Sequence, residues 1–132
     1  MNFKEQTYYF IGIGGIGMSS IARYLFLQGA SVFGYDKTRS AVTSSLEELG
    51  VTIVYDAAVS SLLAAVSSKE SLVVYTPAVS EEHPQLNFFI NQGNKVVKRA
   101  KLLGDSTRDT ICLAVAGTHG KTTTTAILTH LF

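Results

Sequence analysis

The chain has 132 residues, of which 46% are apolar and 16% charged, a composition typical of a globular domain. Its formal net charge of +1, from 11 basic and 10 acidic residues, gives no indication of a nucleic-acid surface or an acidic tail. The one cysteine, Cys112, excludes an intrachain disulfide, and no apolar run approaches the roughly 20 residues of a membrane helix. Because the polar start, residues 1–6, does not resemble a signal peptide, we expect a cytoplasmic protein.

Predicted strands and helices alternate along the chain. Runs of β-forming residues predict strands at 7–13, 31–35, 51–55, 71–75, 95–98 and 111–116. Helical spacing of apolar residues and terminal glycines predict helices at 17–28, 41–49, 62–66, 85–91, from 100–103 onward, and at 121–132. Repeated β-α-β units of this length imply an α/β fold, a Rossmann-like, doubly wound parallel sheet with helices on both faces.

A polar segment, residues 104–109, separates two patterned regions. We expect residues 1–104 to form a nucleotide-binding domain, residues 105–109 a linker, and residues 110–132 the first strand, loop and helix of a second domain. That short piece cannot bury a core alone, and its helix has no terminal cap, so we expect a truncated domain. Its unpaired strand could also mediate a dimer.

The first predicted strand leads into a glycine loop, Gly12-Ile-Gly14-Gly15-Ile-Gly17, followed by a helix. In this G-x-G-x-x-G pattern, the first glycine allows a tight turn, the second lets the backbone approach a diphosphate, and the third allows close packing of the helix. Asp36 ends the second strand, where a carboxylate accepts hydrogen bonds from a ribose or a base edge. The motif predicts a nucleotide diphosphate and leaves its identity open, with NAD as the usual ligand.

A second glycine loop, Gly117-Thr-His-Gly-Lys-Thr122, follows the apolar strand predicted at 111–116. Backbone amides of such a loop surround phosphates, Lys121 supplies a charge for the β- and γ-phosphates, and the Thr122 hydroxyl is placed to ligate Mg²⁺. The usual longer P-loop would have glycine where this chain has Val115. A dehydrogenase has no use for this loop, and a simple ATPase has no use for the first one.

Two stretches together, residues 12–22 and 114–125, resemble the signatures of the alanine-adding branch of the Mur ligase family, whose shorter ATP loop accounts for Val115. The resemblance implies a three-domain, ATP-dependent ligase with Mg²⁺. It would activate the carboxylate of UDP-N-acetylmuramic acid as an acyl phosphate, which the amine of L-alanine then attacks. It implies catalytic roles for Lys121 and Thr122, with Thr122 also holding Mg²⁺. The implied ATP-binding residues are Gly117, Thr118, His119, Gly120, Lys121, Thr122 and Thr123.

The same resemblance implies a set of residues that bind the UDP-sugar: Gly12, Gly14, Gly15, Ile16, Gly17, Met18, Asp36, Thr76 and Ala78. Thr76-Pro77 departs from the Ser-Ser-Ala or similar run of the family, His83 receives no role, and the basic group at 98–101 is interpreted as solvated surface. We expect this chain to bind the UDP-sugar and to have no ligase activity by itself. Two alternatives remain: an NAD-binding oxidoreductase or regulatory module, and the related ligase that recycles muropeptides onto the same sugar nucleotide.

Overall fold

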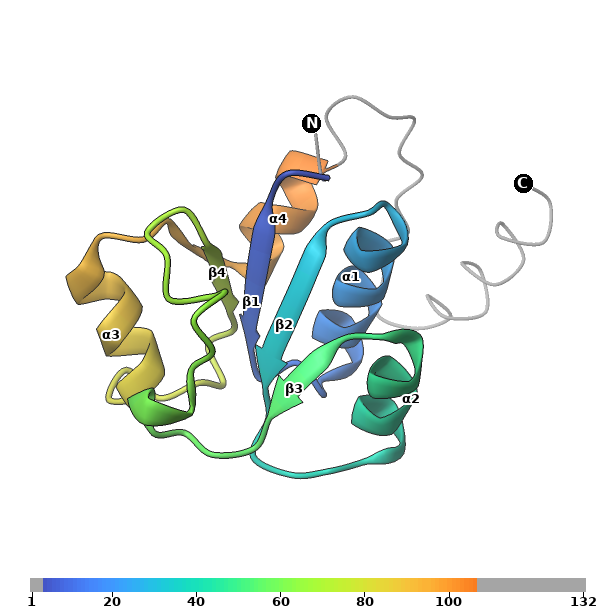
Figure 1. Ribbon diagram of the computed structural model, residues 1–132, viewed down its shortest axis with the longest axis horizontal. Helices are drawn as coiled ribbons and strands as arrows, with labels where there is room; N and C mark the ends of the chain where they lie inside the picture. Colours follow the sequence, from blue (N-terminus) through green and yellow to red (C-terminus); the bar gives the residue numbers. More distant parts are fainter. Residues whose placement is uncertain (1–3, 107–132) are drawn as a thin grey trace, which may run out of the picture.

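The computed structural model describes residues 4–106, which form one parallel sheet covered by helices on both faces (Figure 1). The strand order is β3-β2-β1-β4-β5, and every neighbouring pair runs parallel. The strands are β1 (Thr7–Ile11), β2 (Ser31–Tyr35), β3 (Thr52–Val54), β4 (Leu72–Tyr75) and β5 (Val96–Lys98). From β1 the chain adds β2 and β3 on one side of the sheet and then β4 and β5 on the other, and this change of side confirms the predicted doubly wound sheet.

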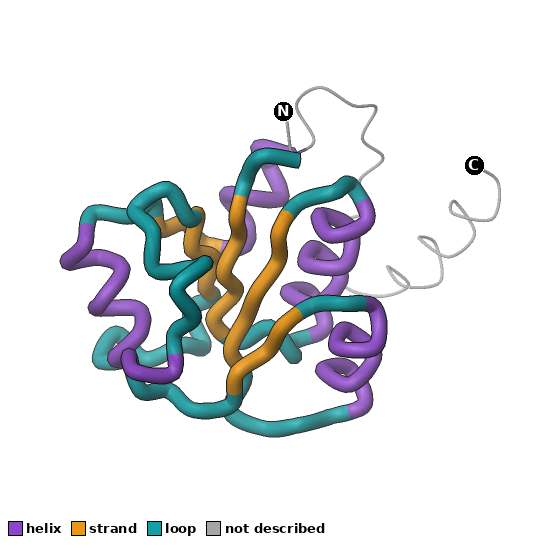
Figure 2. The backbone as a smooth tube through the Cα atoms, viewed as in Figure 1, coloured by secondary structure: helices purple, strands orange, loops and turns teal. Residues whose placement is uncertain are grey.

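The helices divide between the two faces of this sheet (Figure 2). Helices α1 (Ile16–Leu27), α2 (Ala41–Leu49) and α4 (Arg99–Ser106) contribute Leu25, Leu46 and Leu102 to one apolar cluster. Helix α3 (Pro84–Gln92) contributes Leu86 and Phe89 to the other, beside the short 3₁₀ helix η1 (Val59–Ser61).

The central strand β1 supplies both cores because successive side chains of a strand point to opposite faces. Tyr8 and Phe10 pack in the cluster on the α1 side, and Tyr9 and Ile11 in the cluster on the α3 side. The buried Tyr9 hydroxyl donates a hydrogen bond of 2.8 Å to Gln85 Oε1, which joins β1 to α3. A continuous apolar strand of this kind is typical of a parallel sheet buried on both faces.

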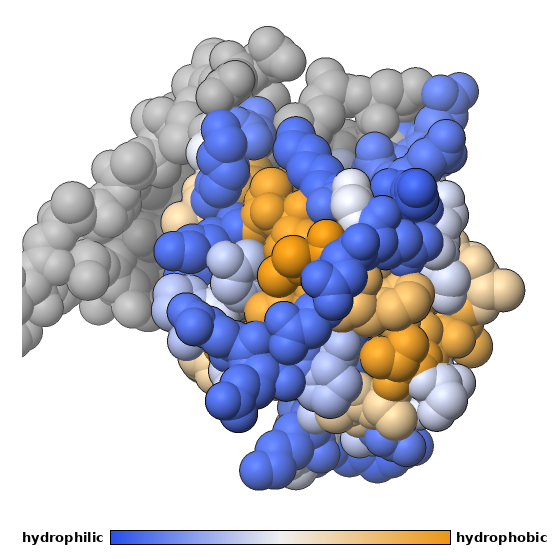
Figure 3. All heavy atoms as spheres, turned by 90° about the vertical axis from the view of Figure 1, so that its left-hand side faces the viewer, coloured by the Kyte–Doolittle hydropathy of each residue, from blue (hydrophilic) through white to orange (hydrophobic). Residues whose placement is uncertain are grey.

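On the outside, apolar surface is interrupted by polar side chains. The side view over α3 shows apolar areas separated by hydrophilic residues (Figure 3), and Ile90 on α3 is 53% exposed. Within residues 4–106, no helix combines the length and apolar character needed to cross a membrane.

Three segments differ from the sequence-based expectation. The first strand ends at Ile11 instead of residue 13, because Gly12 leaves the extended conformation with a φ of 89°. The helix predicted at 62–66 is wrong: this segment forms turns around the buried Val66, and five residues are too few to sustain a helix. Helix α4 continues to Ser106 and so includes two residues of the expected linker 105–109. The strand, loop and helix expected at 110–132, with Cys112, lie outside the described residues, and the domain division stays a prediction.

Candidate nucleotide-binding site

The loop between β1 and α1 is held against the end of β2. The amides of Gly12 and Ile13 both donate to the Tyr35 carbonyl oxygen, at 2.8 and 2.9 Å, and the Gly15 amide donates to the Gly12 carbonyl at 3.2 Å. The φ of Gly12 lies in the region that favours glycine, so the turn requires this residue. These bonds fix the loop without any bound ligand.

Asp36 completes this loop from the neighbouring strand end. Its carboxylate accepts hydrogen bonds from the Gly14 amide at 2.7 Å and the Thr38 amide at 3.1 Å. A Cβ atom added at Gly14 would lie 2.6 Å from Asp36 Oδ2. The motif predicts a diphosphate beside Gly14. In the structure, the Asp36 carboxylate occupies this space.

The first turn of α1 offers the amides that remain. Gly15 is its N-cap residue, no side chain caps the helix, and no acidic residue stands in the first turn. Helix geometry leaves the amides of Ile16, Gly17 and Met18 without an intrahelical acceptor. With the positive end of the helix dipole behind them, these three amides can donate hydrogen bonds to an anion.

Arg99 brings a positive charge to the same place. Its guanidinium packs beside Gly17, because a Cβ atom added at Gly17 would lie 1.9 Å from Arg99 Nη1. Because Gly17 has no side chain, the Arg99 guanidinium can occupy the space beside it. Arg99 follows β5 directly, and sequence analysis missed it by interpreting the basic group 98–101 as surface. The signal was available, since in a parallel sheet the residues that follow each strand meet at one edge.

Gly12, Gly15, Gly17, Met18, Asp36 and Arg99 line one cavity of about 700 Å³ at the carboxyl edge of the sheet. This volume is within the usual range for small-molecule sites. The opposite wall comes from the connection between β4 and α3, where a turn is closed by a 3.0 Å bond from the Val79 amide to the Thr76 carbonyl. Pro77 is the second residue of this turn, a position that proline favours, so Thr76-Pro77 shapes the wall.

Seven of the nine residues predicted to bind the UDP-sugar line this cavity: Gly12, Gly15, Gly17, Met18, Asp36, Thr76 and Ala78. Gly14 and Ile16 are not among the lining residues, and the Ile16 side chain is 84% exposed. The predicted ATP and Mg²⁺ residues, 117–123, lie outside the described part of the chain. The cavity is also lined by four residues for which the sequence patterns predict no ligand role: Tyr35, Lys37, Ser80 and His83.

Tyr35 and His83 form the wall on the α3 side. Their rings meet edge to face with centroids 4.9 Å apart. Burial lowers the pKa of His83 from its ordinary value of 6.5. Burial also raises the pKa of Tyr35, with further contributions from the charges of Asp36 and Asp56. Both side chains are therefore neutral at neutral pH.

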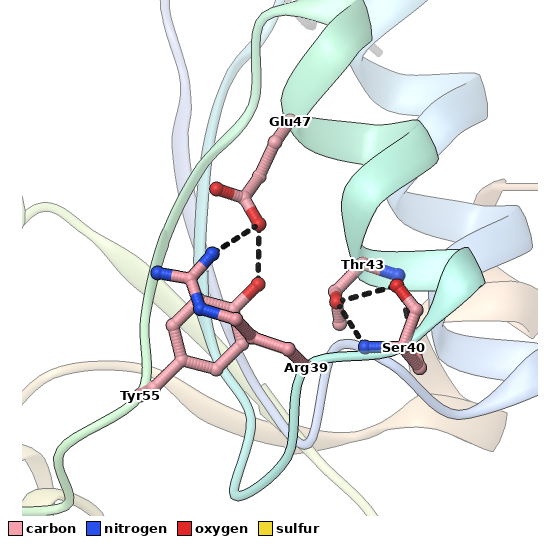
Figure 4. Close-up of polar contacts among 5 residues, drawn as sticks. All are labelled: Arg39, Ser40, Thr43, Glu47 and Tyr55. Atoms are coloured by element: carbon pink, nitrogen blue, oxygen red, sulfur yellow. Dashed lines mark hydrogen bonds and ion pairs between the residues drawn. The ribbon is translucent and has the colours of Figure 1, made fainter.

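The connection between β2 and α2 is fixed by a polar cluster beyond the cavity (Figure 4). The Arg39 guanidinium lies 4.2 Å from the Tyr55 ring centroid, Arg39 Nη1 lies 3.6 Å from Glu47 Oε1, and the Tyr55 hydroxyl donates to the same carboxylate. This cluster anchors the connection shortly after Lys37, an exposed cation at the cavity.

Comparison with known proteins agrees with the resemblance found in the sequence. The profile of the Mur ligase family, catalytic domain, matches residues 7–110. The UDP-N-acetylmuramate–L-alanine ligase of Flavobacterium psychrophilum is 50% identical over 132 residues, which is 99% of this chain and 30% of that relative. The chain thus spans under a third of the length of this curated relative.

Two solved structures share the fold closely. The UDP-N-acetylmuramate-alanine ligase from Thermotoga maritima matches with a TM-score of 0.86 and 31% identity, over 96% of this chain and 29% of that one. The UDP-N-acetylmuramate:L-alanyl-γ-D-glutamyl-meso-diaminopimelate ligase from Neisseria meningitides matches with a TM-score of 0.81 and 27% identity, over 93% of this chain and 38% of that one. Because the family profile covers most of the chain and the fold agrees, this chain belongs to the Mur ligase family.

Proposed function

We propose that this chain binds UDP-N-acetylmuramic acid and is the sugar-nucleotide-binding part of an enzyme that joins L-alanine to it. One observation carries the proposal: a single cavity combines the uncapped N-terminus of α1 with the side chains of Arg99 and Lys37. The amides of Gly17 and Met18 and the two cations complement the negative charge of a diphosphate. The names of the relatives at 43–50% identity support the choice of sugar nucleotide and amino acid.

Within the cavity, the diphosphate would lie on the amides of Gly17 and Met18, beside Arg99. The nucleoside would extend toward Asp36 and Lys37. The Asp36 carboxylate already accepts two backbone amides, but its oxygens keep lone pairs that can accept a ribose hydroxyl. Thr76 and Ala78 would contact the ligand from the opposite wall.

For the complete enzyme, we propose a two-step reaction in the cytoplasm. A carboxylate oxygen of the sugar attacks the γ-phosphorus of ATP, ADP leaves, and an acyl phosphate forms. The amine of L-alanine then attacks the acyl carbon, loses a proton and displaces phosphate. ATP and Mg²⁺ would be held by the loop 117–123, with Lys121 and Thr122 in the roles that the family resemblance implies. This chain by itself is expected to bind the sugar nucleotide and to lack ligase activity.

The muropeptide-recycling alternative receives less support. The curated relatives named UDP-N-acetylmuramate–L-alanine ligase are 43–50% identical to this chain. Among the solved structures, the alanine ligase from Thermotoga maritima is 31% identical and the ligase from Neisseria meningitides 27%, with TM-scores of 0.86 and 0.81. An NAD-binding module remains testable, because a glycine loop of this type serves either nucleotide.

Calorimetric titration of the 132-residue chain with UDP-N-acetylmuramic acid and, separately, with NADH tests the proposal. We expect saturable binding of the UDP-sugar and none of NADH.

Arg99→Met should weaken UDP-sugar binding by about 10- to 100-fold, since it removes a charge-assisted contact. Lys101→Met is the matched control: Lys101 lies on the same helix, pairs with Asp105 at 3.0 Å and does not line the cavity, so affinity should not change. Saturable NADH binding without a response to the UDP-sugar would refute the proposal.

A further inference from the structure

The cavity has one wall with no charged side chain of its own. Tyr35 ends β2 and His83 precedes α3, and both line the cavity on the α3 side of the sheet. No residue among 4–106 hydrogen-bonds to the Tyr35 hydroxyl. Neither ring nitrogen of His83 has a hydrogen-bond partner among the described residues, and the imidazole ring packs edge to face against Tyr35.

This wall differs in chemistry from the rest of the site. The N-terminus of α1 and Arg99 favour negative charge, whereas the phenol and the imidazole are both neutral at neutral pH. Burial raises the pKa of Tyr35 most, and the carboxylates of Asp36 and Asp56 raise it further. The same two negative charges would repel an anionic group placed beside Tyr35. The wall therefore suits an uncharged, hydrogen-bonding part of a ligand.

The position of the wall formed by Tyr35 and His83 determines which part of the ligand would contact it. Along the carboxyl edge of the sheet, Arg99 follows β5 and Tyr35 ends β2, with the glycine loop of β1 between them. A diphosphate on the glycine loop beside Arg99 leaves one end of the ligand near β2. Of the two ends of a UDP-N-acetylmuramic acid molecule, the nucleoside is uncharged and the sugar carries a carboxylate. The charges of Asp36 and Asp56 favour the uncharged end.

We propose that Tyr35 is a specificity-determining residue for the nucleoside, with its hydroxyl hydrogen-bonding to the ribose or base, and that His83 is the positioning residue that holds the phenol ring. This inference rests on the proposed function, because it requires a nucleoside diphosphate in the cavity. It assigns roles to two residues that the glycine-loop motif does not include.

Titrations of the 132-residue chain with UDP, and with inorganic pyrophosphate in competition with UDP, separate the two halves of the site. Tyr35→Phe keeps the ring and should weaken UDP binding by about 3- to 10-fold, the effect of one neutral hydrogen bond, with pyrophosphate affinity unchanged. Arg99→Met should weaken both ligands. This contrast is a readout that a general loss of structure would not produce.

Two variants of His83 test its positioning role. His83→Phe preserves an aromatic edge against Tyr35, so its UDP affinity should stay within about two-fold of that of the unmodified chain. His83→Ala removes this contact and should weaken UDP binding as much as Tyr35→Phe does. Adding His83→Ala to Tyr35→Phe should then cause no further loss of UDP affinity. Thermal unfolding of each variant checks that it is folded.

An unchanged UDP affinity in Tyr35→Phe, or an equal loss for UDP and pyrophosphate, would overturn the inference while leaving the proposed function intact. Failure of the unmodified chain to bind UDP or the UDP-sugar would instead overturn the proposed function. The two failures are therefore distinguished by the unmodified chain.

Discussion

Gly14 and Gly17 belong to one motif but face different groups. A side chain at Gly14 would meet the Asp36 carboxylate, which is fixed by two amide hydrogen bonds, and also Thr43 Cγ2 at 3.0 Å. A side chain at Gly17 would meet the end of the exposed and flexible Arg99 side chain. Glycine at position 14 is therefore required by the structure of the loop, and glycine at position 17 by the position of the Arg99 guanidinium.

Alanine substitutions at the two glycines should consequently have opposite effects. Gly14→Ala should lower the free energy of unfolding by about 1–3 kcal/mol, the usual cost of overpacking a fixed contact. Gly17→Ala should leave stability unchanged or raise it by up to about 1 kcal/mol, because alanine favours the helix and Arg99 can move aside. Its UDP affinity should nevertheless fall, since Arg99 is displaced. Urea unfolding and titration with UDP measure the two effects, and a stability loss in Gly17→Ala as large as in Gly14→Ala would contradict the argument.

At the scale of elements, helix α2 begins with a reciprocal cap (Figure 4). Ser40 Oγ accepts from the Thr43 amide at 3.2 Å, and the Ser40 amide donates to Thr43 Oγ1 at 2.9 Å. Arg39 precedes this cap and contacts Tyr55 and Glu47. The cap and the cluster together determine where the connection that carries Asp36 and Lys37 can lie.

Removal of the cap should therefore destabilise the chain. Ser40→Ala is expected to lower the free energy of unfolding by about 1 kcal/mol, because a helix amide loses its acceptor. Ser44→Ala is a matched control on the same helix: this exposed serine has no cap role, and alanine should raise stability by about 0.5 kcal/mol or less. Denaturant unfolding of both variants gives the comparison. Equal effects of the two substitutions would show that the cap does not stabilise α2.

At the scale of the whole molecule, patterns within short stretches predicted the sheet, its parallel strands and the glycine loop. Local periodicity and glycine spacing determine these features, so one sequence is enough to find them. Arg99 and Tyr35 were missed as site residues because their roles depend on which strand ends become neighbours. All strands of a parallel sheet end at one edge, but the sequence separates Arg99 from Gly17 by 82 positions, and the strand order with the packing of α4 decides that they become neighbours there. The role of Gly14 was missed for the same reason, since its neighbour Asp36 follows a different strand.

The described residues contain both apolar clusters, whose buried members run from Tyr8 to Leu102, and the cavity, whose lining runs from Ile11 to Arg99. A chain ending at Ser106 should therefore fold by itself, unfold cooperatively, and bind UDP with the affinity of the 132-residue chain within about two-fold. Circular dichroism during urea unfolding and calorimetry test this expectation. Light scattering of both chains tests the predicted dimer, which should be lost with residues 107–132. An unfolded or non-binding shortened chain would place the domain boundary beyond Ser106, because the clusters that the sequence assigns to the first domain would then be insufficient to form it.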